Sequence, residues 1–236
     1  MLPTALFGSG FGAGLGYGVI SGVVTLGIGD SMFLLSIRQT GASVAAPVVY
    51  TYVLMIQLAG FALGQVVPYS NFVAASMVVL GVYILSRGGD GRPRARGIAF
   101  ALVAAVAWTV GQELIQAATS AGGDFLVVTF ARNAAAALAL GLALLATGKF
   151  RAWPSGLARR EVGTIAFFIL SDLVVGSLLF VYSISTVGVA LTVIVTSLSP
   201  LMTQVFSRAL GKESPSRQDF AGGALIVAAL VLALVA

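Results

Sequence analysis

Long apolar stretches alternate with short segments marked by glycine, proline or charge along the whole chain. A hydrocarbon core about 30 Å thick needs roughly 20 apolar residues per helix. The pattern therefore predicts an all-α fold, a polytopic transmembrane helix bundle of about eight spans with no separate soluble domain. The predicted spans cover residues 14–37, 42–64, 71–86, 97–120, 124–148, 162–185, 189–210 and 220–236.

Composition supports this assignment and narrows the possible chemistry. Of the 236 residues, 58% are hydrophobic and 9% are charged, and the mean hydropathy is +1.03. A soluble domain is about 25% charged, so this chain lacks the charge to cover a water-exposed surface. The absence of histidine and cysteine excludes catalysis, disulfides and metal sites that depend on them. We expect no cofactor, no metal and no nucleic-acid partner.

Basic residues gather on one side of the predicted bundle. Every Lys and Arg except Arg132 lies in or beside the segments that follow spans one, three, five and seven. The positive-inside rule places this side in the cytoplasm and both termini outside, in a multi-pass protein of the cell membrane. These basic residues are Arg38, Arg87, Arg92, Arg94, Arg96, Lys149, Arg151, Arg159, Arg160, Arg208, Lys212 and Arg217.

The chain also aligns with itself at a shift of 147 residues. The shift matches spans one, two and three with spans six, seven and eight, so the second copy is inverted in the membrane. Inverted repeats are typical of transporters whose substrate site lies between the repeats. We expect an incomplete first repeat of about three helices at 1–88, a basic connection at 89–96 and a second repeat of about five helices at 97–236. Identical pairs include Gly29 with Gly176, Ser36 with Ser183, Gly41 with Gly188, and Gln57 with Gln204.

Three segments of the second repeat resemble a known family. They are Leu-Ser-Pro-Leu-Met at 198–202, Gly-Lys-Glu at 211–213 and Gln-Asp-Phe-Ala-Gly-Gly-Ala-Leu-Ile at 218–226. These segments are similar to the second half of EamA-type transporters, of the drug/metabolite transporter superfamily. The resemblance implies a permease or exporter of amino acids or small polar metabolites that works by alternating access in the lipid bilayer. It also implies that the family's first two helices have no counterpart in this chain.

Four ionisable residues fall within the predicted spans: Asp30, Glu113, Arg132 and Asp172. A charge at a helix centre costs roughly 2.5–3.5 kcal/mol on insertion scales, so such residues usually face a cavity or a partner. Arg132 and Glu113 lie at similar depth, and either clamp a substrate by its anionic and amine groups or form a structural ion pair. Asp172 and Asp30 are candidates for proton or cation coupling, or for hydrogen-bonded carboxyls against a neighbouring helix.

Polar side chains at helical spacing extend this candidate site. Gln112 precedes Glu113, and Thr196 and Ser199 belong to a hydroxyl stripe in the seventh span. Such stripes line hydrated cavities or hold helices together. We assign Gln112, Thr196, Ser199 and Trp108 to substrate binding with Arg132 and Glu113. Pro200 is a candidate gate element, because a proline inside a span frees a backbone carbonyl and allows a bend.

Glycines at 10, 14, 18 and 22 form a small-residue face suited to close helix contact. Because the partner helices of the family have no counterpart here, this face could pack against a second subunit in a homodimer. Two rival functions stay open beside transport. One is a non-transporting membrane scaffold or truncated pseudo-transporter. The other, an intramembrane enzyme, is the least favoured, because the carboxylates are scattered singly and no phosphate-binding GxxxxGK[ST] motif occurs.

Overall fold

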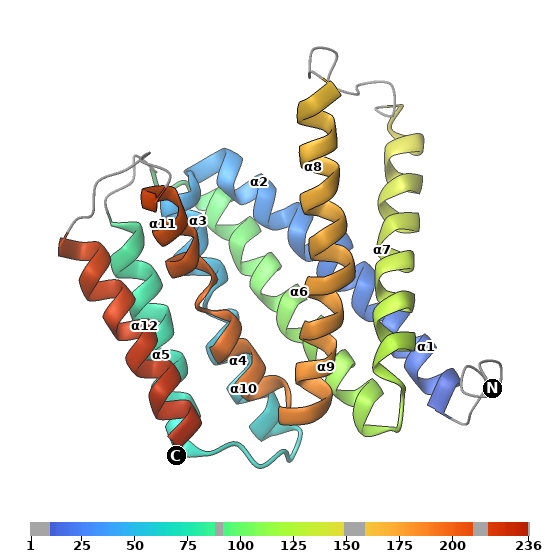
Figure 1. Cartoon of the computed structure of the whole chain (residues 1–236), viewed down its shortest axis with the longest axis horizontal. Coiled ribbons are helices and arrows are strands. Elements are labelled where there is room, and N and C mark those ends of the chain that lie inside the picture. Colours follow the sequence, from blue (N-terminus) through green and yellow to red (C-terminus); the bar gives the residue numbers. More distant parts are fainter. Residues whose placement is uncertain (1–9, 88–91, 149–158, 210–216, 236) are drawn as a thin grey trace.

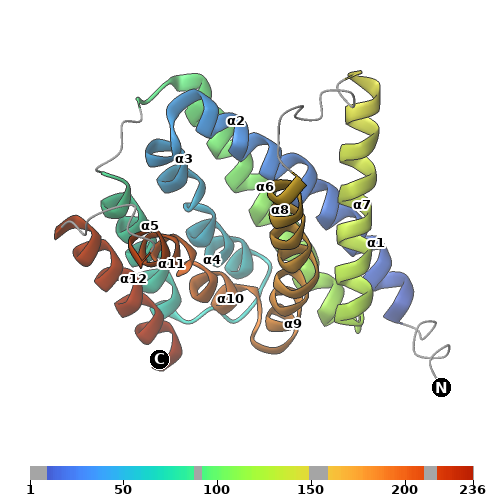
Figure 2. The same cartoon turned by 45° about the horizontal axis from the view of Figure 1, so that its top comes forward.

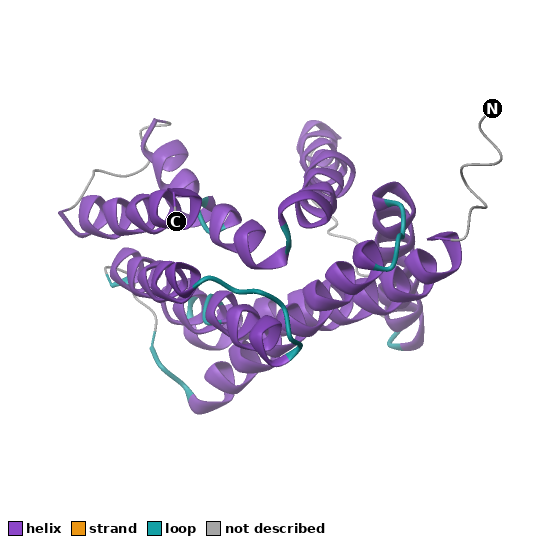
Figure 3. Cartoon of the chain, turned by 90° about the horizontal axis from the view of Figure 1, so that it is seen from below, coloured by secondary structure: helices purple, strands orange, loops and turns teal. Residues whose placement is uncertain are grey.

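The computed structural model describes residues 10–87, 92–148, 159–209 and 217–235, which are helices joined by short connections, with no strand among them (Figure 3). This confirms the all-α fold. Two stretches, η1 and η3, are π-helical. In chain order, the elements are α1 (Gly10–Gly22), η1 (Val23–Gly29), α2 (Asp30–Thr40), α3 (Ala42–Val49), α4 (Tyr52–Ala62), α5 (Tyr69–Ser86), α6 (Ala95–Ser120), α7 (Phe125–Ala146), α8 (Arg159–Ser171), η3 (Asp172–Gly176), α9 (Ser177–Val187), α10 (Val189–Thr196), α11 (Ser199–Ala209) and α12 (Arg217–Val235).

Six described helical segments are long and apolar enough to cross a membrane, and two further apolar helices are shorter. The seventh predicted span, 189–210, is not one continuous helix, because a turn at Ser197 and Leu198 divides it into α10 and α11. The polytopic helical bundle is confirmed. The long segments are Gly14–Thr40, Ala42–Ala62, Tyr69–Ser86, Ala95–Ser120, Phe125–Ala146 and Glu161–Val187, and the shorter ones are Val189–Met202 and Phe220–Val235.

The internal repeat of the sequence recurs in the element boundaries. The bounds of α3 and α10 are 147 positions apart, and so are those of α4 and α11. A π-helical stretch precedes both α2 and α9. The two copies also share a turn, in which Gly41 has φ 81° and Gly188 has φ 83°, values at which a side chain would be strained. A helix pair in each half therefore has the same breaks at matching positions.

The copies differ in how well their first helical segments are covered. In the first half, α1 and α2 pack against α6 and α7, and 28% of the most apolar window of Gly14–Thr40 is buried. In the matching segment, Glu161–Val187, only 6% of the most apolar window is buried. Figures 1 and 2 show α5 and α12 side by side at one edge, with α8 rising apart from them. Among the described elements, α8 packs mainly against η3, the segment that follows it.

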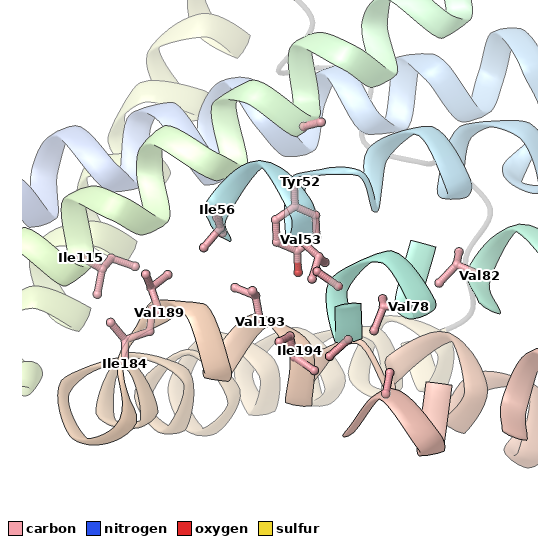
Figure 4. Packing of buried hydrophobic residues seen from close by; sticks show 14 of the residues in the cluster. Tyr52, Val53, Ile56, Val78, Val82, Ile115, Ile184, Val189, Val193 and Ile194 are labelled. Carbon is pink, nitrogen blue, oxygen red and sulfur yellow. The ribbon is translucent and has the colours of Figure 1, made fainter. Parts of the chain in front are cut away.

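An apolar core joins α4, α5, α6, α9, α10 and α12. Figure 4 shows Ile56, Ile115, Val189 and Val193 gathered between α4, α6 and α10. Ile56, Ile115 and Val193 are fully buried. The two halves of the chain are therefore held together by side chains from both repeats.

The glycine face of α1 is occupied within the same chain. A methyl group at Gly18 or Gly22 would meet the backbone of α7, at Val128 and Arg132, and one at Gly14 would touch Gly123 and Val128. This contact corrects the expectation that the face is free for a second subunit. The spacing indicated close helix contact, but only the packing shows that α7 provides it. The surroundings of Gly10, the first glycine of this face, lie outside what the structure describes.

The two ends of α6 allow a test of orientation. Arg94, at the start of α6, is exposed, and Ser120, at the other end of α6, is exposed as well. Since the natural chain has no cysteine, we expect an impermeant thiol reagent to label Ser120→Cys but not Arg94→Cys in intact cells. Labelling of Arg94→Cys alone would reverse the predicted orientation.

Candidate functional site

A cavity of about 530 Å³ lies where the two halves of the chain meet. We call it the central cavity. Its walls contain pairs of residues that are 147 positions apart and so occupy matching places in the two repeats. The pairs are Thr25 with Asp172, Leu26 with Leu173, Asp30 with Ser177, and Tyr52 with Ser199. The repeat interface, where a transporter holds its substrate, is thus hollow and lined with polar groups.

Local irregularities of the helices bring these groups to the cavity. Thr25 comes from η1, and Asp172 and Gly176 come from η3. A π-helical stretch widens the helix by shifting its hydrogen bonds, and such stretches are frequent at functional sites. The break between α10 and α11 places Thr196 and Ser199 on either side of a turn, with both at the cavity. Each repeat therefore contributes one π-helical segment and one broken helix to the site.

Trp108 forms one wall and fixes the position of Asp30. Its indole Nε1 donates a hydrogen bond of 2.9 Å to Asp30 Oδ1. The ring packs edge-on against Phe33 and Tyr52, with centroids 5.5 and 5.2 Å apart. This close approach requires a glycine at position 29, because a methyl group there would lie 2.7 Å from Trp108 Nε1. The aromatic wall and one carboxylate of the cavity are thus joined by a direct hydrogen bond.

Arg132 is the single positive charge among the residues that line this cavity, and its side chain is 5% exposed. Its Nη1 donates to Ser177 Oγ at 3.2 Å, and its guanidinium carbon lies 5.8 Å from the centre of the Phe180 ring. Ser177 Oγ donates to Asn133, whose amide donates to the Leu173 carbonyl at 2.7 Å. This network joins α7 to η3 and α9.

The guanidinium still has unused hydrogen-bonding capacity. Within the described chain, its Nε is buried and has no partner, and the same holds for Gln112 Oε1 and Thr25 Oγ1 at this cavity. A buried polar atom without a partner costs about 1–3 kcal/mol. A ligand that accepts from the guanidinium and donates to Gln112 would recover part of that energy. Asp30 and Asp172 add two carboxylates to the walls, so the site can bind groups of both signs.

The structure brings most of the predicted site residues to this one cavity. Those that line it are Arg132, Gln112, Thr196, Ser199, Trp108, Asp172 and Asp30. Glu113 instead lines a separate cavity and accepts a hydrogen bond from Gln65. Consecutive residues of a helix point about 100° apart, so Gln112 and Glu113 face different cavities. Arg132 and Glu113 therefore do not meet as one clamp, and no ion pair joins them in the described chain.

Pro200 also has a different setting from the one expected. It stands in the first turn of α11, just after the break at Ser197 and Leu198, rather than inside a continuous helix. A proline in a first turn removes no helical hydrogen bond. The first repeat has the same break before Tyr52, although Val53 occupies the position that corresponds to Pro200. The repeat architecture, and not this proline, therefore sets the break.

Sequence reasoning missed Tyr52 and Ser177, whereas it placed Asn133 on a polar stripe with Arg132. Tyr52 and Ser177 correspond to Ser199 and Asp30 under the shift of 147 residues, so applying the repeat to each candidate would have found them. Asn133 follows Arg132 directly, but its role depends on the carbonyl that Leu173 exposes in a π-helical stretch. No sequence signal reveals that carbonyl.

Comparison with known proteins identifies a matching family model, a related sequence and structures of similar fold. A family model described as the EamA-like transporter family matches residues 95–235. A protein of Archaeoglobus fulgidus, named only as an uncharacterized transporter, is 27% identical over 221 residues, which are 92% of this chain and 74% of that protein. One known crystal structure, at 21% identity and a TM-score of 0.69, covers 94% of this chain and 85% of its own chain. The latter similarity concerns the fold alone.

Proposed function

The chain belongs to the EamA-like transporter family, and from that premise we propose that it moves amino acids or small polar metabolites across the cell membrane by alternating access. Its long apolar helices and its family make it a multi-pass integral membrane protein. One observation carries the proposal: the cavity between the repeats contains a buried arginine and two carboxylates beside an aromatic wall.

The lining of the central cavity suits a small zwitterion. Arg132 would bind a carboxylate through its unpartnered edge. Asp30 or Asp172 would accept from an ammonium group, while Gln112, Thr196 and Ser199 supply further polar contacts and Trp108 forms the apolar wall. Ligand pockets typically measure about 300–1,000 Å³, and the cavity volume of about 530 Å³ lies in that range.

The broken helices supply the movement that alternating access needs. Helix breaks precede Tyr52 and Ser199, and each of these residues lines the cavity. At both breaks, backbone bonds that span three residues, such as Val53 N–H to the Tyr50 carbonyl and Leu198 N–H to the Val195 carbonyl, replace some α-helical bonds. Discontinuous helices at the midplane are typical of transporters with inverted repeats. Pro200 stays the proposed gate element, because it stands in the first turn of α11, beside the break that this movement would use.

A transport screen tests this proposal. The purified chain in proteoliposomes should take up at least one labelled amino acid, and a matched amine or carboxylic acid that lacks the second charge should compete poorly. Protein that is folded but transports no member of a panel of amino acids and polar metabolites would favour the scaffold alternative. Transport limited to uncharged solutes would remove the role proposed for Arg132 and the carboxylates.

Asp172→Asn should separate substrate movement from energy coupling. The carboxyl lines the cavity from η3, and the amide has nearly the same size but cannot carry a proton. We expect the variant to fold and to exchange substrate, while accumulation driven by an imposed pH gradient falls to the level of empty vesicles. Asp30→Asn, the comparison variant, tests the second carboxylate. Unchanged accumulation by Asp172→Asn would leave this carboxyl with a packing role.

A further inference from the structure

A second cavity, of about 650 Å³, lies where α6 ends, at the opposite end of that helix from Arg94. We call it the end cavity. The connection between α4 and α5, the last turns of α6, the turn between α9 and α10, and Ala233 of α12 form its walls. It is separate from the central cavity. The fully buried Ile56, Ile115 and Val193 belong to the apolar core at this end of α4, α6 and α10 (Figure 4).

Glu113 is the single ionisable residue among those that line the end cavity. Its Oε2 accepts a hydrogen bond of 2.8 Å from Gln65 Nε2. Its Oε1 is buried and has no partner in the described part of the chain. No Lys or Arg is among the lining residues. A buried carboxylate oxygen without a donor is costly, and a proton on the carboxyl, or a donor or cation in the cavity, removes that cost.

The Gln116 amide, which also lines the end cavity, does not supply the missing donor. Gln116 Oε1 accepts from the Val189 backbone N–H at 2.8 Å, and Gln116 Nε2 donates to Ser120 Oγ at 3.0 Å. Both ends of that amide are thus engaged away from Glu113. When Glu113 is ionised, the cavity presents a negatively charged acceptor, and an ammonium group, which has three donors and no acceptor, complements it.

We propose that the end cavity is a binding site for a primary ammonium group, with Glu113 Oε1 as its anionic partner. The apolar side chains of Leu63, Val66 and Leu191 also line this cavity, and the hydrocarbon part of an amine would lie against them. Gln112 and Glu113 are consecutive on α6 and face the central and the end cavity. An amine-bearing substrate would therefore find a second acidic binding site along this helix. That last role rests on the proposed transport function, whereas the binding site does not.

The reactivity of a single cysteine can report the charge of this cavity. Ser120 lines the cavity, and the natural chain has no cysteine, so Ser120→Cys in the full chain in detergent is the reporter. Its rates of modification by aminoethyl and sulfonatoethyl methanethiosulfonate give a cation-to-anion ratio. We expect Glu113→Gln to lower this ratio about tenfold, because the variant removes one unit of negative charge from the lining of the same cavity. Ethylammonium should slow the cationic reagent, and ethanol should not.

Matched variants locate the effect. Glu113→Asp retains the charge and should keep the ratio, and Asp30→Asn should keep it because that carboxyl lines the other cavity. An unchanged ratio in Glu113→Gln overturns the proposal, as does ethylammonium protection that disappears only in Asp30→Asn. If Glu113→Gln does not fold, lack of ethylammonium protection in the reporter chain alone is enough to reject the site. Because these rates do not measure transport, protection without transport would keep the site and remove the proposed function.

Discussion

Arg132→Lys is expected to yield folded protein that transports its substrate about 10–100-fold more slowly than the natural chain. The guanidinium donates to Ser177 through Nη1 and keeps a buried, unpartnered Nε. A lysine ammonium keeps the charge but lacks the planar fork that can hold Ser177 and a substrate carboxylate together. The initial rate of uptake by proteoliposomes with equal amounts of folded protein measures the loss.

Two further variants show whether the loss reflects substrate binding. Arg94→Lys, at the exposed start of α6, makes the same chemical change far from the cavity and should transport at the natural rate. Arg132→Ala should lose transport as well, together with some folded yield, because the contacts to Ser177 and Phe180 are lost. Normal transport by Arg132→Ala would exclude both the substrate-binding and the structural role.

Gly22→Ala should sharply lower the yield of folded protein, whereas Gly16→Ala on the same helix should leave it unchanged. A methyl group at Gly22 would overlap the backbone of Arg132, which cannot move aside as the tip of a side chain can. At Gly16 nothing lies within 4 Å of the added carbon. Overpacking typically costs about 1–3 kcal/mol, and a clash with backbone should lie at the upper end of that range.

Samples of each variant are heated to a series of temperatures, and size-exclusion chromatography measures the folded fraction that remains. The temperature at which half of the protein stays folded is the thermal midpoint to compare. Both variants replace glycine with alanine in α1, so helix propensity changes equally and only the contact with α7 differs. Gly22→Ala should also weaken transport, because the separation of α1 from α7 would displace Arg132. Equal midpoints for the two variants would show that α1 and α7 do not approach as closely as the structure indicates.

Much of the architecture followed from the sequence, because the membrane imposes length and polarity on every span. Apolar stretches of the required length predicted the helices, and the shift of 147 residues predicted matching elements in the two halves. Burying charge is expensive, so Asp30, Arg132 and Asp172 stood out as cavity residues before their positions were known. The structure places all three around the central cavity.

The tertiary structure alone decided which side chains meet. Helical periodicity gives the angle between neighbouring residues but not the rotation of a helix about its axis, so it could not assign Gln112 and Glu113 to different cavities. Small residues predicted that α1 touches something closely but could not identify α7 as its partner. The polar network of Arg132 depends on a carbonyl exposed in η3. Such contacts join residues far apart in the chain, and their geometry arises only when the helices pack.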